Sequence, residues 1–125
     1  MYDSNPRATF SHAVEQLNQF DLGYLHITEV GKEAAGAAGP VFGLDLLRQI
    51  WQGIYITNGG YDQSRGNAAI ISNAADAIAF GTLFLANPDL PSRFRLNAAL
   101  NEADYTTFYE GGELGYADYP ELGKP

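Results

Sequence analysis

Hydrophobic positions along the chain change from helical spacing to strand-like runs and back again. Asn5 and Pro6 are typical of a helix cap and a first helical position, and apolar residues then recur at helical spacing up to residue 20. A short run over residues 23–28 follows, rich in residues that favour buried parallel strands. A helix followed by such a strand predicts an α/β alternation.

The same alternation continues through the middle of the chain. Hydrophobic spacing and glycine positions predict a short helix over residues 44–51, a strand over 54–57, a helix from about 62 to 73 and a third strand over 77–80. Ala68, Ala69 and Ile71 are the expected buried positions of the longer helix. Asn87, Pro88 and Asp89 resemble a further cap, with proline at the first position of a last helix.

In two segments the hydrophobic residues follow neither helical nor strand-like spacing. Residues 30–41 are rich in glycine and alanine, which favours a surface connection over a packed element and makes the segment a candidate lid. Residues 101–125 are rich in glycine, tyrosine and acidic residues, and we expect an ordered tail or a wrapping loop.

The predicted elements are therefore one helix, three βα units and a tail. With 125 residues the chain has room for one domain, in which residues 1–100 hold the helix and the βα units and residues 101–125 form the tail. A closed (β/α)₈ barrel has eight strands and typically about 250 residues, so three strands leave two unpaired sheet edges. We therefore expect a partial barrel that is completed by a missing N-terminal segment or by association into a homo-oligomer.

Two of the predicted strands end on glycine. One runs into Asn58, Gly59 and Gly60, and the other ends at Gly81. Glycine lets backbone N–H groups approach a phosphate closely, and the glycine turns after the last two strands of a (β/α)₈ barrel form a known kind of phosphate site. The pattern indicates a phosphate-bearing cofactor or substrate. A structural interpretation stays open, in which the glycines only permit tight turns.

Composition narrows the classes of partner. Fifteen acidic and seven basic residues give a net charge of −8, and the cations are scattered along the sequence, which argues against nucleic acid and anionic membrane as partners. The chain has no cysteine, and its two histidines, His12 and His26, lie apart, so no metal site is expected. With no long apolar run and an acidic start, we expect a cytoplasmic protein.

Several motifs together resemble the C-terminal third of the old yellow enzyme family. They are Tyr24-Leu25-His26, Asn58-Gly59-Gly60-Tyr61, Ala79-Phe80-Gly81, Leu85-Ala86-Asn87-Pro88-Asp89-Leu90, Phe108-Tyr109-Glu110-Gly111-Gly112 and Gly115-Tyr116-Ala117-Asp118-Tyr119-Pro120. The resemblance covers essentially the whole chain in order. The family consists of FMN-dependent (β/α)₈ ene-reductases and includes the oxophytodienoate reductases, so the resemblance implies the last three βα units of a TIM barrel.

The resemblance also implies a cofactor site. Asn58, Gly59 and Gly60 in one loop, and Gly81 and Thr82 in the next, would hold the FMN phosphate through backbone N–H groups. Many family members carry arginine where this chain has Thr82, so the charge-assisted bond to phosphate is absent here. Tyr116 matches a tail tyrosine beside the flavin and substrate pocket, although it could equally be a packing aromatic.

The resemblance implies the function as well. In the complete enzyme, FMN takes hydride from NAD(P)H and passes it to an activated alkene, and the residues that grip and protonate the substrate lie in earlier barrel units. No catalytic residue is therefore assigned in this chain. The alternative is a non-catalytic, truncated barrel fragment that self-associates and binds at most a phosphate-type anion.

Overall fold

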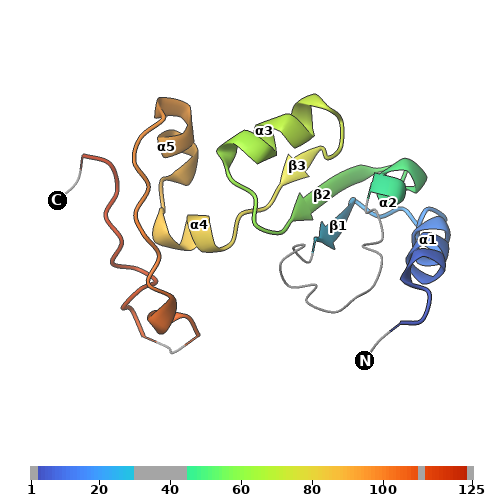
Figure 1. Ribbon diagram of the computed structural model, residues 1–125, viewed down its shortest axis with the longest axis horizontal. Coiled ribbons are helices and arrows are strands. Elements are labelled where there is room, and N and C mark those ends of the chain that lie inside the picture. The colour runs from blue at the N-terminus through green and yellow to red at the C-terminus, as the bar shows by residue number, and fades with distance from the viewer. Residues whose placement is uncertain (1–2, 30–44, 110–111, 124–125) are drawn as a thin grey trace. The chain divides into compact units, whose positions relative to one another are not determined.

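The computed structural model describes residues 3–29, 45–109 and 112–123 (Figure 1). The chain divides into two compact units, Met1–Ala79 and Phe80–Pro125, and each is described below by itself. The candidate lid over residues 30–41 lies outside the described residues.

The first unit contains the predicted α/β alternation. Its elements are α1 (Pro6–Leu17), β1 (Tyr24–Thr28), α2 (Asp45–Ile50), β2 (Ile54–Asn58), α3 (Gln63–Ile71) and β3 (Ala77–Ile78). Asn5 caps α1, since its side-chain oxygen accepts from the N–H of Ala8 at 3.2 Å, and Pro6 takes the first helical position. Asp62 caps α3 in the same way, through a 2.7 Å bond from the N–H of Arg65.

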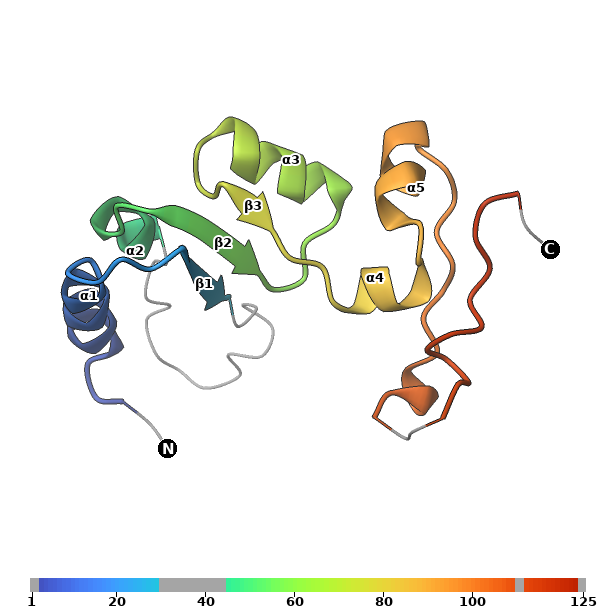
Figure 2. The ribbon, with the colours of Figure 1, turned by 180° about the vertical axis from the view of Figure 1, so that it is seen from behind.

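The three strands form a parallel sheet in the order β1-β2-β3 (Figures 1 and 2). Residues in register share a face of the sheet, because successive side chains point to opposite faces. One face carries Leu25, Ile27, Tyr55, Thr57 and Ile78, and the other carries Tyr24, His26, Thr28, Ile54, Ile56, Asn58 and Ala77. A small parallel sheet with helices confirms the α/β class and is consistent with a partial barrel.

The core of this unit lies on the first of these faces. Val14 of α1, Leu47 of α2, and Trp51 are buried against Tyr55 of β2, with Ala75 beside them. Trp51 is further fixed by a 2.8 Å bond from its indole Nε1 to the carbonyl oxygen of Ile54. The helices α1 and α2 therefore cover one face of the sheet, and the hydrophobic core of the unit lies between them and that face.

The opposite face is open in the described structure. Tyr24 and Ile54 keep 58% and 54% of their accessible surface, and His26 is also exposed. Large apolar side chains on a strand favour burial, so this face carries apolar surface that the described residues leave uncovered.

The expected buried face of α3 is only partly correct. Ala69 is buried together with Gly66, whereas Ala68 is exposed and Ile71 keeps 82% of its surface. Gly66 and Ala69 are three residues apart and so share one helical stripe, whereas Ile71, two residues beyond Ala69, cannot share it. Only a narrow stripe of small residues packs inward.

The second unit holds α4 (Thr82–Ala86), α5 (Leu90–Leu96) and a 3₁₀ turn, η1 (Tyr105–Thr107). The predicted cap at Asn87 with Pro88 is wrong. Asp89 is the cap of α5, and Pro91 lies in its first turn. The unpredicted helix α4 ends at Ala86, and Asn87 is fully buried at its end.

Two buried polar side chains, Asn87 and Arg93, and two half-buried ones, Asp89 and Asn101, tie the tail to these helices. We call Asn87, Asp89, Arg93 and Asn101 the tail clamp. Asn101 donates from its side chain to the carbonyl oxygens of Ala86 at 2.8 Å and Pro120 at 2.9 Å. Its own N–H donates to the side-chain oxygen of Asn87 at 2.7 Å. Asn87 is therefore buried because a residue fourteen positions later satisfies it.

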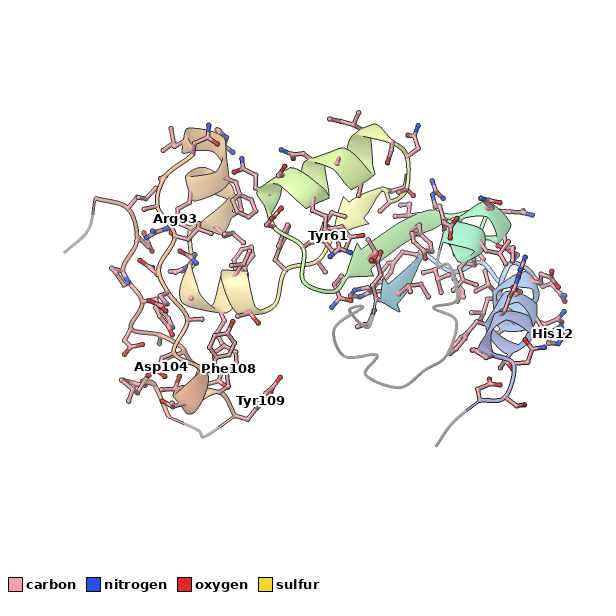
Figure 3. The ribbon with its side chains drawn as sticks, in the orientation of Figure 1. His12, Tyr61, Arg93, Asp104, Phe108 and Tyr109 are labelled. Carbon is pink, nitrogen blue, oxygen red and sulfur yellow. The ribbon has the colours of Figure 1, made fainter. Side chains whose placement is uncertain are left out.

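Arg93 is the centre of the tail clamp (Figure 3). Its guanidinium donates three bonds of 2.6 Å, to the carboxylate of Asp89 and to the carbonyl oxygens of Ala99 and Pro120. Asp89 also accepts from the N–H of Leu122 at 2.8 Å. The Arg93 hydrogen bond, followed by that of Leu122, lowers the pKa of Asp89 from its ordinary value.

Candidate phosphate-binding turns

The first glycine turn follows β2 directly. Gly59 and Gly60 have φ values of +128° and +64°, a region that residues with side chains rarely adopt. A Cβ atom at Gly59 would overlap the carbonyl oxygen of Glu29, whereas the nearest atom to a Cβ at Gly60 is Nη1 of Arg65, 3.9 Å away. Gly59 is thus required by close packing against Glu29, the residue that follows β1, and Gly60 leaves space on the turn.

A polar cluster lies beneath this turn. We call Glu29, Thr57, Tyr61 and Arg65 the Glu29 cluster. The Glu29 carboxylate accepts from the hydroxyl groups of Thr57 at 3.0 Å and Tyr61 at 2.6 Å, and from Arg65 at 2.8 Å. The cluster joins the residue after β1, the end of β2 and the first turn of α3.

Arg65 also binds the turn itself. Its Nη1 donates to the carbonyl oxygens of Gly59 at 2.9 Å and Gly60 at 3.3 Å, and its guanidinium lies 4.1 Å from the ring centre of Tyr61. Because the C=O and N–H of a trans peptide point in opposite directions, the N–H groups of Gly60 and Tyr61 point away from Arg65. Neither N–H has a hydrogen-bond acceptor within the described residues. The turn therefore presents two consecutive backbone donors, which is the chemistry of an anion-binding concavity.

The side chain of Asn58 ends β2 beside this turn. Its Oδ1 atom is buried, and it has no hydrogen-bond partner in the described part of the chain. An unpartnered buried acceptor costs about 1–3 kcal/mol, so this position is incomplete as it stands.

The second glycine turn lies in the other unit. Gly81 precedes α4 without a side-chain cap, and a Cβ atom there would meet no heavy atom within 4 Å. Thr82 is the first residue of α4 and is partly buried. The open space at Gly81 is compatible with the approach of a ligand to the backbone.

Tyr116 lies in the tail of the same unit. Its hydroxyl oxygen accepts from the N–H of Tyr109 at 2.7 Å, and Tyr116 keeps 41% of its surface. Tyr109, labelled in Figure 3, is 94% exposed. A tyrosine that folds the tail and still shows an exposed ring can serve packing, ligand contact or both.

The predicted site residues thus fall into two groups. Asn58, Gly59 and Gly60 form one turn in the first unit, and Gly81, Thr82 and Tyr116 belong to the second. Sequence reasoning did not identify the Glu29 cluster. The position of Glu29 just after a strand and the four-residue spacing of Tyr61 and Arg65 are the only local signals of it.

The protonation of Tyr61 supports its role as a donor. Burial, followed by its hydrogen bond to Glu29, raises the pKa of the Tyr61 hydroxyl above its ordinary value. Burial and the nearby Glu29 charge raise the pKa of Tyr55 to about 12. Both phenols are therefore neutral at physiological pH, and Tyr61 donates its proton to the carboxylate.

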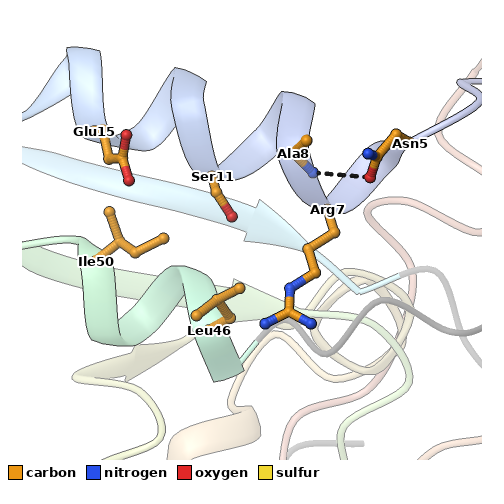
Figure 4. A pocket seen from close by; sticks show the side chains of 7 residues that line it. All are labelled: Asn5, Arg7, Ala8, Ser11, Glu15, Leu46 and Ile50. Atoms are coloured by element: carbon orange, nitrogen blue, oxygen red, sulfur yellow. Dashed lines mark hydrogen bonds between the residues drawn. The ribbon is translucent and has the colours of Figure 1, made fainter.

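An open groove lies between α1 and α2 (Figure 4). It is lined by Asn5, Arg7, Ala8, Ser11, Glu15, Leu46 and Ile50, none of which is a predicted site residue. Within the described residues, no three His, Asp or Glu side chains gather as metal ligands. The described helices also include none with the length and apolar character needed to cross a membrane.

Comparison with known proteins identifies relatives of the chain by sequence. No family model matches the chain. It is 43% identical to 12-oxophytodienoate reductase 1 of Oryza sativa over 125 residues, which is 97% of this chain and 33% of that protein. It is 39% identical to 12-oxophytodienoate reductase 2 of Arabidopsis thaliana over 96% of this chain and 33% of that protein.

Solved structures of related reductases are also similar to the chain. Morphinone reductase superposes with a TM-score of 0.87 at 45% identity, covering 97% of this chain and 32% of that one. The old yellow enzyme from Trypanosoma cruzi superposes with a TM-score of 0.87 at 34% identity, with coverage of 98% and 32%. The chain is therefore related to the old yellow enzymes over nearly all of its length. It spans about a third of theirs, in agreement with the predicted resemblance to their C-terminal third.

Proposed function

We propose that the chain is the C-terminal part of an FMN-dependent ene-reductase, comprising the last three βα units of the barrel and the helix before them. The observation that carries the proposal is the turn after β2, whose Gly60 and Tyr61 N–H groups are unpartnered within the described residues. Relatives of 12-oxophytodienoate reductase type support the reaction class. In the complete enzyme, bound FMN would transfer hydride from NAD(P)H to an activated alkene.

The chain's own contribution is to bind and orient the cofactor phosphate. In this proposal the Asn58-Gly59-Gly60 turn and the Gly81-Thr82 turn each donate backbone N–H groups, and the Thr82 hydroxyl adds a neutral donor. The space at Gly60 and Gly81, which a Cβ would occupy, fits a phosphate approaching the backbone. Tyr116 is proposed to lie beside the flavin. The chain is not assigned a residue that activates or protonates the alkene.

A single substitution tests the phosphate site. Thr82→Arg places a guanidinium where the chain has a hydroxyl, and a charge-assisted bond should strengthen FMN binding by about 1.5–3 kcal/mol. Riboflavin, which lacks the phosphate, should bind the variant and the wild type equally. The measurement is a fluorescence titration of the full chain with each flavin.

Thr9→Arg is the matched control, because Thr9 is an exposed residue of α1 and the variant has the same net charge. FMN affinity that rises equally in both variants would show only a general charge effect. FMN affinity that stays unchanged in Thr82→Arg would mean that the phosphate is not bound at that turn.

We further propose that the barrel is completed by protein outside this chain. The outer edges of β1 and β3 have no strand partner among the described residues, and Tyr24 and Ile54 lie exposed on the open sheet face. Burying a large apolar side chain contributes about 1.5–3 kcal/mol, so leaving several in water forfeits much of a domain's usual stability. An N-terminal segment, or further copies of the chain, would cover this face.

The sheet edges and the apolar face that the described residues leave uncovered also favour a second candidate function, which applies to the chain without an N-terminal segment. A self-associating, non-catalytic fragment would bind at most a phosphate-type anion. Size-exclusion chromatography with light scattering tests whether other protein completes the barrel. We expect that copies of the chain assemble, or that the chain folds only with the N-terminal segment. A cooperatively melting, compact species at 13.6 kDa would contradict it.

A further inference from the structure

The direction of the peptide groups in the turn after β2 depends on one side chain. Arg65 donates hydrogen bonds to the carbonyl oxygens of both Gly59 and Gly60, and so fixes which side of the turn carries the N–H groups. We propose that Arg65, held by Glu29 and Tyr61, is a positioning residue that sets the affinity of this turn for a phosphate monoester. The inference rests on the proposed function of the turn.

Two adjacent glycines make such a device necessary. Glycine adopts positive and negative φ with similar ease, so a Gly-Gly pair can rotate its peptide groups at little cost. A rotated peptide would present a carbonyl oxygen where the phosphate needs an N–H, and two oxygens would then repel each other. Arg65 blocks this rotation because each carbonyl would have to give up its guanidinium bond.

The rest of the Glu29 cluster fixes Arg65 in turn. Glu29 accepts from Nη2 of Arg65, while Nη1 reaches the two glycine carbonyls (Figure 3 shows Tyr61 at this site). The Tyr61 ring packs against the guanidinium, and its hydroxyl binds the same carboxylate. The planar guanidinium is thereby held on three sides.

The charge of Arg65 is balanced within the cluster. The Arg65 and Glu29 side chains keep 50% and 26% of their surface and form an ion pair of 2.8 Å. Because the pair is neutral overall, its effect on an anion comes through the orientation of the peptides. A simple charge effect and a positioning effect then make opposite predictions for Glu29.

Three variants of the full chain separate these effects. Arg65→Lys keeps the charge but loses the planar group that binds two carbonyls and a carboxylate together, and should weaken FMN binding about tenfold. Glu29→Gln removes a negative charge near the turn yet releases Arg65, and should also weaken it. Arg48→Lys is the control, since Arg48 forms a comparable ion pair with Asp76 in the same unit.

The readout is the ratio of the dissociation constants for riboflavin and FMN, which isolates the phosphate contribution. Backbone amide NMR signals of Gly60 and Tyr61 give a second readout that needs no ligand, and they should shift in Arg65→Lys and stay in place in Arg48→Lys. A ratio that is unchanged in Arg65→Lys, tighter FMN binding in Glu29→Gln, or unshifted amide signals would each overturn the inference.

The two proposals fail in distinguishable ways. If the wild-type chain, assembled with itself or with the N-terminal two-thirds of a related old yellow enzyme, binds FMN no better than riboflavin, the proposed phosphate site fails and the inference fails with it. If the wild type prefers FMN and Arg65→Lys keeps the full preference, the inference alone fails.

Discussion

Replacement of Arg93 by methionine should release the tail from α5. Methionine retains much of the apolar stem but none of the donors, so Asp89, Ala99 and Pro120 each lose a bond of 2.6 Å. The Arg93 and Asp89 side chains keep only 6% and 15% of their surface. The variant thus leaves the Asp89 carboxylate without its charge partner and the Ala99 carbonyl oxygen without a donor. Asp89 keeps its bond from Leu122, and Pro120 keeps its bond from Asn101.

The size of the effect follows from this burial. The part-buried carbonyl oxygen of Ala99 loses its donor, and leaving such an acceptor unsatisfied costs about 1–3 kcal/mol. Asn101 still binds Ala86 and Pro120, so the loss should appear first as local opening of the tail. An opening that is easier by this amount accelerates amide exchange by roughly five- to a hundredfold.

Hydrogen exchange over residues 98–109 and 112–123 measures the prediction directly. Arg95→Met is the matched control, because Arg95 lies on the same helix and is exposed. We expect fast tail exchange in Arg93→Met, wild-type exchange in Arg95→Met, and intermediate exchange in Arg93→Lys. Equal tail protection in Arg93→Met and Arg95→Met would refute the tail clamp.

Two further predictions concern the glycine turns and acid. Gly59→Ala should destabilise the first unit by more than about 2 kcal/mol, because its positive φ alone costs about 1–2 kcal/mol and its Cβ overlaps the Glu29 backbone. Gly81→Ala, where a Cβ meets nothing, should stay within about 0.5 kcal/mol; equal urea midpoints for the two variants would contradict this. The lowered pKa of Asp89 means that its stabilisation is present above its unfolded pKa and is lost as the pH falls through the lower folded value. The protection factors of the tail amides, which compare their exchange with that of an unstructured peptide at the same pH, should therefore fall in acid below about pH 4 in the wild type and lose this pH dependence in Asp89→Asn.

The alternation of elements in the first unit could be predicted from hydrophobic spacing and caps. The buried half of each strand could not, because a parallel strand is apolar on both faces. Only the register shows that Leu25, Ile27 and Ile78 face the helices while Ile54 and Ile56 lie on the open face.

Long-range polar contacts account for what the sequence could not show. Asn87 before a proline is locally a good helix cap, but its bonds with Asn101 place it at the end of α4 instead. Glu29 and Arg65 are 36 residues apart, and neither residue type alone indicates that they meet. The glycine turns could be predicted because backbone conformation at a turn depends on residue type, whereas the side chains that orient them depend on tertiary structure.

The central claim is that this chain supplies the phosphate-binding turns of a flavin-dependent barrel. Its most direct test is to combine the chain with the N-terminal two-thirds of a related old yellow enzyme and to titrate the mixture with FMN and with riboflavin. The account predicts a bound-flavin visible spectrum and clearly tighter binding of FMN than of riboflavin. Assembly of the two parts with equal affinity for the two flavins would contradict it.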